Sequence, residues 1–122
     1  MARTALEMTE DELRQYRPFS RKRPIDEDRF RQAWQVARQA ASLLYATFGV
    51  QKVSVFGSLL HLERFAAWSD IDLAVWGIRP EKFFKAAAKI IDLSPEFEID
   101  LVDAESCSER MKHTIEKEGV IL

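Results

Sequence analysis

Two aspartates at alternate positions are the residues of this chain best suited to chemistry. Asp70 and Asp72 flank Ile71 at the start of an apolar run that continues to Trp76. On a strand, residues i and i+2 point to one face with Cα atoms about 6.5–7 Å apart, so the two carboxylates would repel each other. A divalent cation relieves that repulsion, and Mg²⁺ prefers carboxylate oxygens combined with substrate phosphates. The pair therefore predicts a magnesium site, against the alternative that both aspartates face solvent at a strand start.

A glycine–serine pair lies upstream of these aspartates. Gly57 and Ser58 follow the alternating, β-branched segment 52–56 and precede a short segment of helical character. Glycine lets the backbone approach a ligand closely, and the N–H groups that open a helix attract anions. The Ser58 hydroxyl adds one more hydrogen bond to a phosphate. Although such pairs are frequent in turns, a phosphate pocket beside a metal-binding carboxylate pair is what triphosphate chemistry requires.

A third aspartate completes the candidate set. Asp100 falls within residues 97–102, a predicted strand whose apolar odd-numbered positions share one face while Asp100 lies on the other. If this strand pairs beside that of the first two aspartates, Asp100 joins the metal group and accepts a proton from an attacking hydroxyl as general base. Glu98 and Asp103 are its nearest competitors, and we expect Asp103 to cap the last helix instead.

The elements that must position these residues alternate between helix and strand. A long helix is predicted between Asp26 as N-cap and Gly49 as the residue that ends it. The remaining predicted elements are strands at 52–56, 70–76 and 97–102, helical turns at 58–64, helices at 80–91 and 105–118, and an apolar tail at 120–122. This order favours an α/β (α+β) fold, a small mixed β-sheet packed with helices.

Helical periodicity also predicts which side chains face the core. In the long helix these are Phe30, Ala33, Trp34, Ala37, Ala41, Leu44, Tyr45 and Phe48. In the helix that Pro80 opens they are Phe83, Phe84, Ala87, Ile90 and Ile91.

Length and composition set the outer limits. The 122 residues suit one domain, which we place at residues 26–122 after an N-terminal extension of residues 1–25. Within the extension, Thr9 opens a short predicted helix to about Tyr16, and the basic residues 20–23 are read as a solvated linker rather than a phosphate contact. The formal net charge of −2 does not indicate direct nucleic-acid binding.

Targeting signals and disulfides are not expected. The first residues are too polar for a secretory signal, and no apolar run reaches the ~20 residues that span a bilayer. The single cysteine, Cys107, allows no internal disulfide. We therefore expect a cytoplasmic protein with no membrane association. Cys107 and His113 lie six residues apart, unlike a metal or nucleophile–base pair, and are interpreted as incidental.

These motifs together resemble a known superfamily. The run from Val55 to Ser58, the run from Trp68 to Val75 and the run from Glu98 to Val102 resemble the DNA polymerase beta-like nucleotidyltransferases, above all the minimal nucleotidyltransferases (MNT). The resemblance implies a nucleotidyltransferase fold with ATP as the usual donor. It also implies that Gly57 and Ser58 bind the triphosphate, that Asp70 and Asp72 hold Mg²⁺, and that Asp100 is the third acidic residue.

The chain departs from the family pattern just after the glycine–serine pair. Family members often carry an arginine and a further glycine there, whereas this chain has residues 59–62, Leu-Leu-His-Leu. Arg64 and Lys52 are the candidates to supply the missing positive charge. His61 is read as structural more readily than as a phosphate contact.

The function that follows is Mg²⁺-dependent transfer of a nucleotide to a hydroxyl. Small members of the family are typically paired with a HEPN-domain toxin, so the resemblance implies an antitoxin that moves AMP from ATP to a tyrosine of that toxin. Two alternatives stay open: a non-catalytic antitoxin that acts by binding, and a nucleotidyltransferase for a small molecule. The residues do not specify the nucleobase, the number of nucleotides transferred or the oligomeric state.

Overall fold

The computed structural model describes residues 25–122. The predicted helix at 9–16 and the basic linker at 20–23 lie outside the described residues. The described elements run in the order α3 (Glu27–Phe48), β1 (Lys52–Phe56), the short 3₁₀ turns η1 (Gly57–Leu60) and η2 (Leu62–Arg64), β2 (Ile71–Trp76), α4 (Pro80–Ile91), β3 (Ile99–Asp103), α5 (Glu109–Glu118) and β4 (Val120–Ile121).

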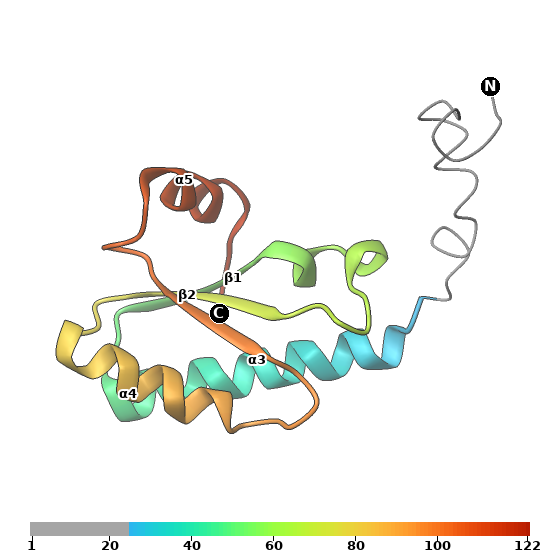
Figure 1. The fold of residues 1–122 in the computed structure, drawn as a ribbon, viewed down its shortest axis with the longest axis horizontal. Helices are drawn as coiled ribbons and strands as arrows, with labels where there is room; N and C mark the ends of the chain where they lie inside the picture. Colours follow the sequence, from blue (N-terminus) through green and yellow to red (C-terminus); the bar gives the residue numbers. More distant parts are fainter. Residues whose placement is uncertain (1–24) are drawn as a thin grey trace, which may run out of the picture.

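The four strands form one mixed sheet in the order β3-β2-β1-β4. β1 pairs antiparallel with β2 and with β4, whereas β2 and β3 are parallel. A parallel pair needs a crossover, which α4 supplies. As Figure 1 shows, α3 and α4 cover one face of the sheet and α5 lies on the other. The predicted fold class is confirmed.

The long helix α3 begins and ends where the sequence predicts. The Asp26 carboxylate accepts a hydrogen bond from the Arg29 N–H, and Gly49 ends the helix with a left-handed φ of 61°. The predicted apolar stripe faces the sheet, where Ala33, Ala37, Ala41 and Leu44 are buried. No helix within residues 25–122 is long and apolar enough to cross a membrane.

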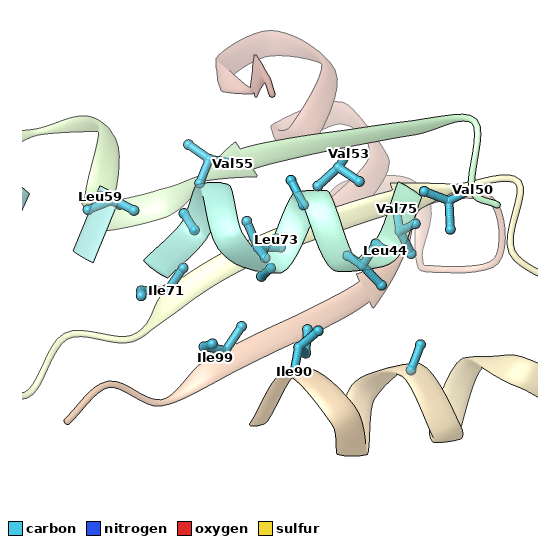
Figure 2. Packing of buried hydrophobic residues seen from close by; sticks show 14 of the residues in the cluster. Leu44, Val50, Val53, Val55, Leu59, Ile71, Leu73, Val75, Ile90 and Ile99 are labelled. Atoms are coloured by element: carbon cyan, nitrogen blue, oxygen red, sulfur yellow. The ribbon is translucent and has the colours of Figure 1, made fainter. Parts of the chain in front are cut away.

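The main core fills the space between the sheet and the α3–α4 layer. Figure 2 shows Leu44 of α3 close to Val75 of β2, and Ile90 of α4 close to Ile99 of β3. Alternate positions of β2, namely Ile71, Leu73 and Val75, are fully buried there. Because side chains alternate along a strand, the even-numbered residues of β2 point to the opposite face of the sheet.

Four local predictions were wrong. The tail at 120–122 is not a free end: Val120 and Ile121 pair with β1 as β4, and the Leu122 N–H donates to the Val53 carbonyl. The last helix begins at Glu109 rather than at residue 105, because the Ser108 hydroxyl caps it by accepting from the Met111 N–H.

Asp103 therefore does not cap α5. It is the last residue of β3, and its carboxylate accepts a hydrogen bond from the Glu105 N–H in a tight turn. In α4, Ile90 is buried and Phe83 packs on the core as predicted, but Phe84 is 80% exposed and Ile91 56% exposed. The small Ala86, buried in the core cluster that also holds the α3 alanines, takes the inward position instead.

Candidate active site

Two of the three aspartates, Asp72 and Asp100, lie on the face of the sheet opposite the main core. Asp72 of β2 and Asp100 of β3 are register partners on adjacent parallel strands. Asp70 immediately precedes β2, two positions from Asp72. Strand alternation directs Asp72 and Asp100 away from the buried Ile71 and Leu73, and the two acidic strands are neighbours as expected.

The Gly57–Ser58 turn lies next to Asp72 on the β1 side, whereas Asp100 lies on the β3 side. Phe56, the last residue of β1, pairs with Asp72, and the chain then turns at Gly57 with φ 81°. A Cβ built on Gly57 would overlap the Asp72 carboxylate and would lie 3.3 Å from its Cγ. Only a glycine accommodates both the positive φ and this close approach. Gly57 therefore brings its backbone directly against Asp72.

Ser58 belongs to a turn rather than to a full helix. The 3₁₀ turn η1 holds only four residues, and the Ser58 carbonyl accepts the His61 N–H at 3.0 Å. So short a turn has little macrodipole, so any phosphate binding here depends on individual N–H groups and the Ser58 hydroxyl.

Electrostatics single out Asp72 among the carboxylates. The pKa of Asp72 is raised from 3.8 to about 6, first by burial and then by the negative charges of Asp100 and Asp70. A half-buried carboxylate that two like charges push toward its protonated form is a common sign of a functional site. A cation or a phosphate-bound metal would reverse this effect.

A cavity of about 480 Å³ opens beside two of the three aspartates. Asp70 and Asp100 contribute to its wall, and most of the remaining wall comes from residues 94–99, the segment that leads into β3. The cavity thus lies on the β3 side of Asp72, whereas the Gly57–Ser58 turn lies on the β1 side. The arrangement leaves one side of the aspartates for each of two reactants.

The carboxylates do not by themselves form a closed metal cage. Within residues 25–122, no group of three or more His, Cys, Asp or Glu side chains is positioned to hold a metal ion. Mg²⁺, however, is usually bound through one or two carboxylates together with substrate phosphates and water. The all-oxygen donor set and the electrostatic strain on Asp72 fit that mode. The assignment of Asp70, Asp72 and Asp100 to one metal centre stays a prediction.

The two candidates for the missing positive charge differ in position. Lys52 lies at the far end of β1, four residues from Phe56 and hence about 13 Å along the strand. Its Nζ lies over the Trp76 ring in a cation–π contact, 4.1 Å from the ring centre. Lys52 is therefore unsuited to the task. Arg64 is exposed and lines a 440 Å³ cavity with His61, so it stays the candidate.

Cys107 and His113 lie apart from the aspartates. The Cys107 Sγ contacts the Ala104 carbonyl at 3.7 Å and packs in the small cluster under α5, and His113 is exposed on that helix.

Sequence patterns gave no reason to select Arg29, which contacts both segments that lead to the acidic strands. Its partners are 38 and 67 residues away, so no local spacing could reveal them.

One known protein family matches most of the described chain. Residues 38–122 match the family model described as polymerase beta, nucleotidyltransferase. The chain belongs to this nucleotidyltransferase family. The matched range contains Gly57, Ser58, Asp70, Asp72 and Asp100. No curated protein sequence is similar enough to the chain to count as a match.

Solved structures support the same fold for this nucleotidyltransferase domain. A structure of the toxin–antitoxin MntA-HepT matches with a TM-score of 0.55 and 22% identity over 72% of this chain and 69% of that one. A toxin–antitoxin structure with AMP-PNP matches with a TM-score of 0.57 and 23% identity, covering 68% and 69% of the two chains. A mutant of the toxin–antitoxin MntA-HpeT matches with a TM-score of 0.57 and 25% identity, covering 70% and 69%.

Proposed function

We propose that this domain transfers AMP from ATP to a hydroxyl in a Mg²⁺-dependent reaction, and that the acceptor is a tyrosine of a cognate HEPN-domain toxin. The observation that carries the proposal is the meeting of Gly57, which directly follows β1, with Asp72 of β2 and Asp100 of β3. This places a close backbone approach, suited to phosphate, beside paired carboxylates, suited to a cation. Family membership supports the reaction class.

Each group would take a distinct part in the reaction. Gly57 and Ser58 hold the β- and γ-phosphates, and Asp70 and Asp72 would hold Mg²⁺, which when bound neutralises the phosphate charge. Asp100, exposed at the edge of the carboxylate group, accepts the proton of the attacking hydroxyl. Positioning and electrostatic stabilisation supply most of the acceleration in such reactions.

The two sides of the site fit an in-line displacement. The attacking oxygen and the leaving pyrophosphate must lie on opposite sides of the α-phosphate. With pyrophosphate leaving toward Gly57 and Ser58, the acceptor enters from the β3 side, where the cavity beside Asp70 and Asp100 opens. The O–H bond of the acceptor and the α–β phosphate bond break, and a new phosphodiester bond forms.

The choice of acceptor draws on the solved relatives. Similar structures are of toxin–antitoxin proteins, one of them with the ATP analogue AMP-PNP. The domain carries little beyond its sheet and three described helices, so a protein partner that completes the acceptor side suits it.

Mass spectrometry of the co-purified toxin tests the proposal. After incubation with ATP and Mg²⁺, we expect the toxin to gain mass in increments of AMP on a tyrosine, and an Asp70→Asn/Asp72→Asn variant to produce none. The variant should also fail to neutralise the toxin. Full neutralisation by that variant would instead show an antitoxin that acts by contact. Labelled AMP on aminoglycosides or small alcohols, with none on protein, would show a small-molecule enzyme.

A further inference from the structure

Arg29, in the first turn of α3, joins two segments that are far apart in the sequence. Its Nη2 donates hydrogen bonds to the Ala67 carbonyl at 3.0 Å and to the Glu96 carbonyl at 3.1 Å. Its guanidinium carbon lies 4.4 Å from the centre of the Phe97 ring. One side chain thus contacts the segment before β2 and the segment before β3.

Both contacted segments lead directly to the acidic residues of the site. Ala67 precedes Asp70 by three residues, and Glu96 precedes Asp100 by four. A second link joins the same segments, because the Ile71 N–H donates to the Glu98 carbonyl at 2.8 Å. Two links in close succession leave the starts of β2 and β3 little freedom to move relative to each other.

The bonding of Arg29 is unusual for a charged side chain. No carboxylate within residues 25–122 pairs with its guanidinium, and the buried Nε has no hydrogen-bond partner there. Carbonyl oxygens and an aromatic face take the place of a salt bridge. The planar fork of arginine can reach two acceptors and stack on a ring at once, which the single ammonium of lysine cannot.

We propose that Arg29 is a positioning residue that fixes the spacing between Asp70 and Asp100 without contacting either substrate. The proposal rests on the nucleotidyl-transfer function proposed above. The side-chain hydrogen bonds of Arg29 go to Ala67 and Glu96 and its ring contact to Phe97, all outside the Gly57–Ser58 turn, so we expect binding of the ATP triphosphate not to depend on it. A misplacement of about 1 Å in a reacting group costs on the order of 100-fold in rate.

The kinetic test compares two arginines of the same helix. Arg38 also lies over an aromatic ring, 5.4 Å from the centre of Trp34, but is not bonded to either acidic segment. We expect Arg29→Met to lower kcat by about 10- to 100-fold with the KM for ATP changed less than about 3-fold. Arg38→Met should leave both constants within about 2-fold of the unmodified protein. Arg29→Lys, which keeps the positive charge but loses the planar fork that reaches both carbonyls, should lower kcat by an intermediate amount.

A second measurement does not depend on transfer activity. Hydrogen exchange of Arg29→Met should show faster exchange at the Ile71 amide and in residues 96–100, with β1 unchanged. Mn²⁺ titrated in the presence of AMP-PNP should bind more weakly to Arg29→Met than to Arg38→Met. If the unmodified protein transfers no nucleotide, the proposed function fails, while these two readouts still decide the role of Arg29.

Three results would overturn the proposal for Arg29. One is unchanged exchange at Ile71 together with unchanged Mn²⁺ binding in Arg29→Met. Another is an equal loss of kcat in Arg38→Met, which would indicate a general effect of disturbing α3. The third is a parallel change in kcat and KM that disappears when the protein is assayed well below its melting temperature, which would indicate lost stability alone.

Discussion

Asp72 of β2 lies directly opposite Asp100 of β3 in the parallel part of the sheet. Like charges at facing positions destabilise a sheet, and here burial adds to the effect and raises the pKa of Asp72 to about 6. The domain thus carries a local electrostatic cost at the point where its chemistry is proposed. Functional sites commonly trade stability for activity in this way.

Replacing Asp72 should therefore stabilise the metal-free protein. The pKa of Asp72 rises from 3.8 to about 6 on folding, so protonation of this carboxyl favours the folded state; that contribution is fully present below pH 3.8 and is lost as the pH rises through 6. At pH 7.5 with EDTA we expect Asp72→Asn to raise the free energy of unfolding by about 1 kcal/mol, because solvent partly screens this half-buried carboxylate. At pH 4 the advantage should vanish. Urea denaturation at both pH values measures this.

Glu63→Gln, at an exposed carboxylate of the η2 turn, is the control and should change stability by less than about 0.5 kcal/mol. A less stable Asp72→Asn protein at pH 7.5 would contradict the electrostatic account.

Gly57→Ala should damage the site more than the fold. Gly57 and Gly49 both have positive φ, at 81° and 61°, so alanine strains the backbone at either position by about 1 kcal/mol. A Cβ at Gly49 meets nothing within 4 Å, whereas one at Gly57 collides with the Asp72 carboxylate. We expect Gly57→Ala to lower kcat by about 100-fold, while Gly49→Ala changes only thermal stability. Equal activity in the two variants would show that the contact with Asp72 is unimportant.

Asp100→Asn should remove the general base. Loss of a general base typically costs about 10²- to 10⁴-fold in rate, so kcat should fall within that range while ATP binding persists. Glu98→Gln, at the exposed residue two positions earlier, is the matched control and should retain kcat within about 3-fold. Steady-state kinetics with the purified toxin measures both. A larger loss in Glu98→Gln would transfer the role of base to Glu98.

Tyr45→Phe should weaken the fold without affecting catalysis. The Tyr45 hydroxyl accepts the Val53 N–H at 2.9 Å and donates to the Leu122 carbonyl at 3.1 Å, which ties α3 to β1 and to the end of the chain. Leaving a buried N–H unpaired costs about 1–3 kcal/mol. Thermal unfolding should show that loss. Thr114→Val, which removes a hydroxyl bond within α5, should cost less than about 0.5 kcal/mol.

The acidic strands could be predicted from sequence because their signals are local. Alternation around Asp72 and Asp100 fixes which face each carboxylate takes, and the apolar partners on the other face bury against α3 and α4. The caps at Asp26 and Gly49 likewise depend only on nearby residues. Whether the three carboxylates hold one metal ion is not a local property, and it stays a prediction.

The elements that sequence reasoning missed depend on distant partners. β4 is two residues long and exists only because β1 offers it an edge, so its own sequence shows no strand. In α4, apolar residues occur on more than one face, and contact with α3 favours Ala86 over the larger Phe84 as the inward residue. The start of α5 is ambiguous in the sequence because Asp103 and Ser108 are both favourable N-cap residues. In the structure Asp103 bonds within the tight turn after β3, and Ser108 caps the helix.

The candidate site residues lie on or directly beside β1, β2 and β3. No two of these strands position all of them. A chain in which any one of these strands has detached would therefore have no competent site. A partly unfolded molecule of this kind would have no transferase activity. For the proposed transferase, activity would therefore depend on an intact sheet.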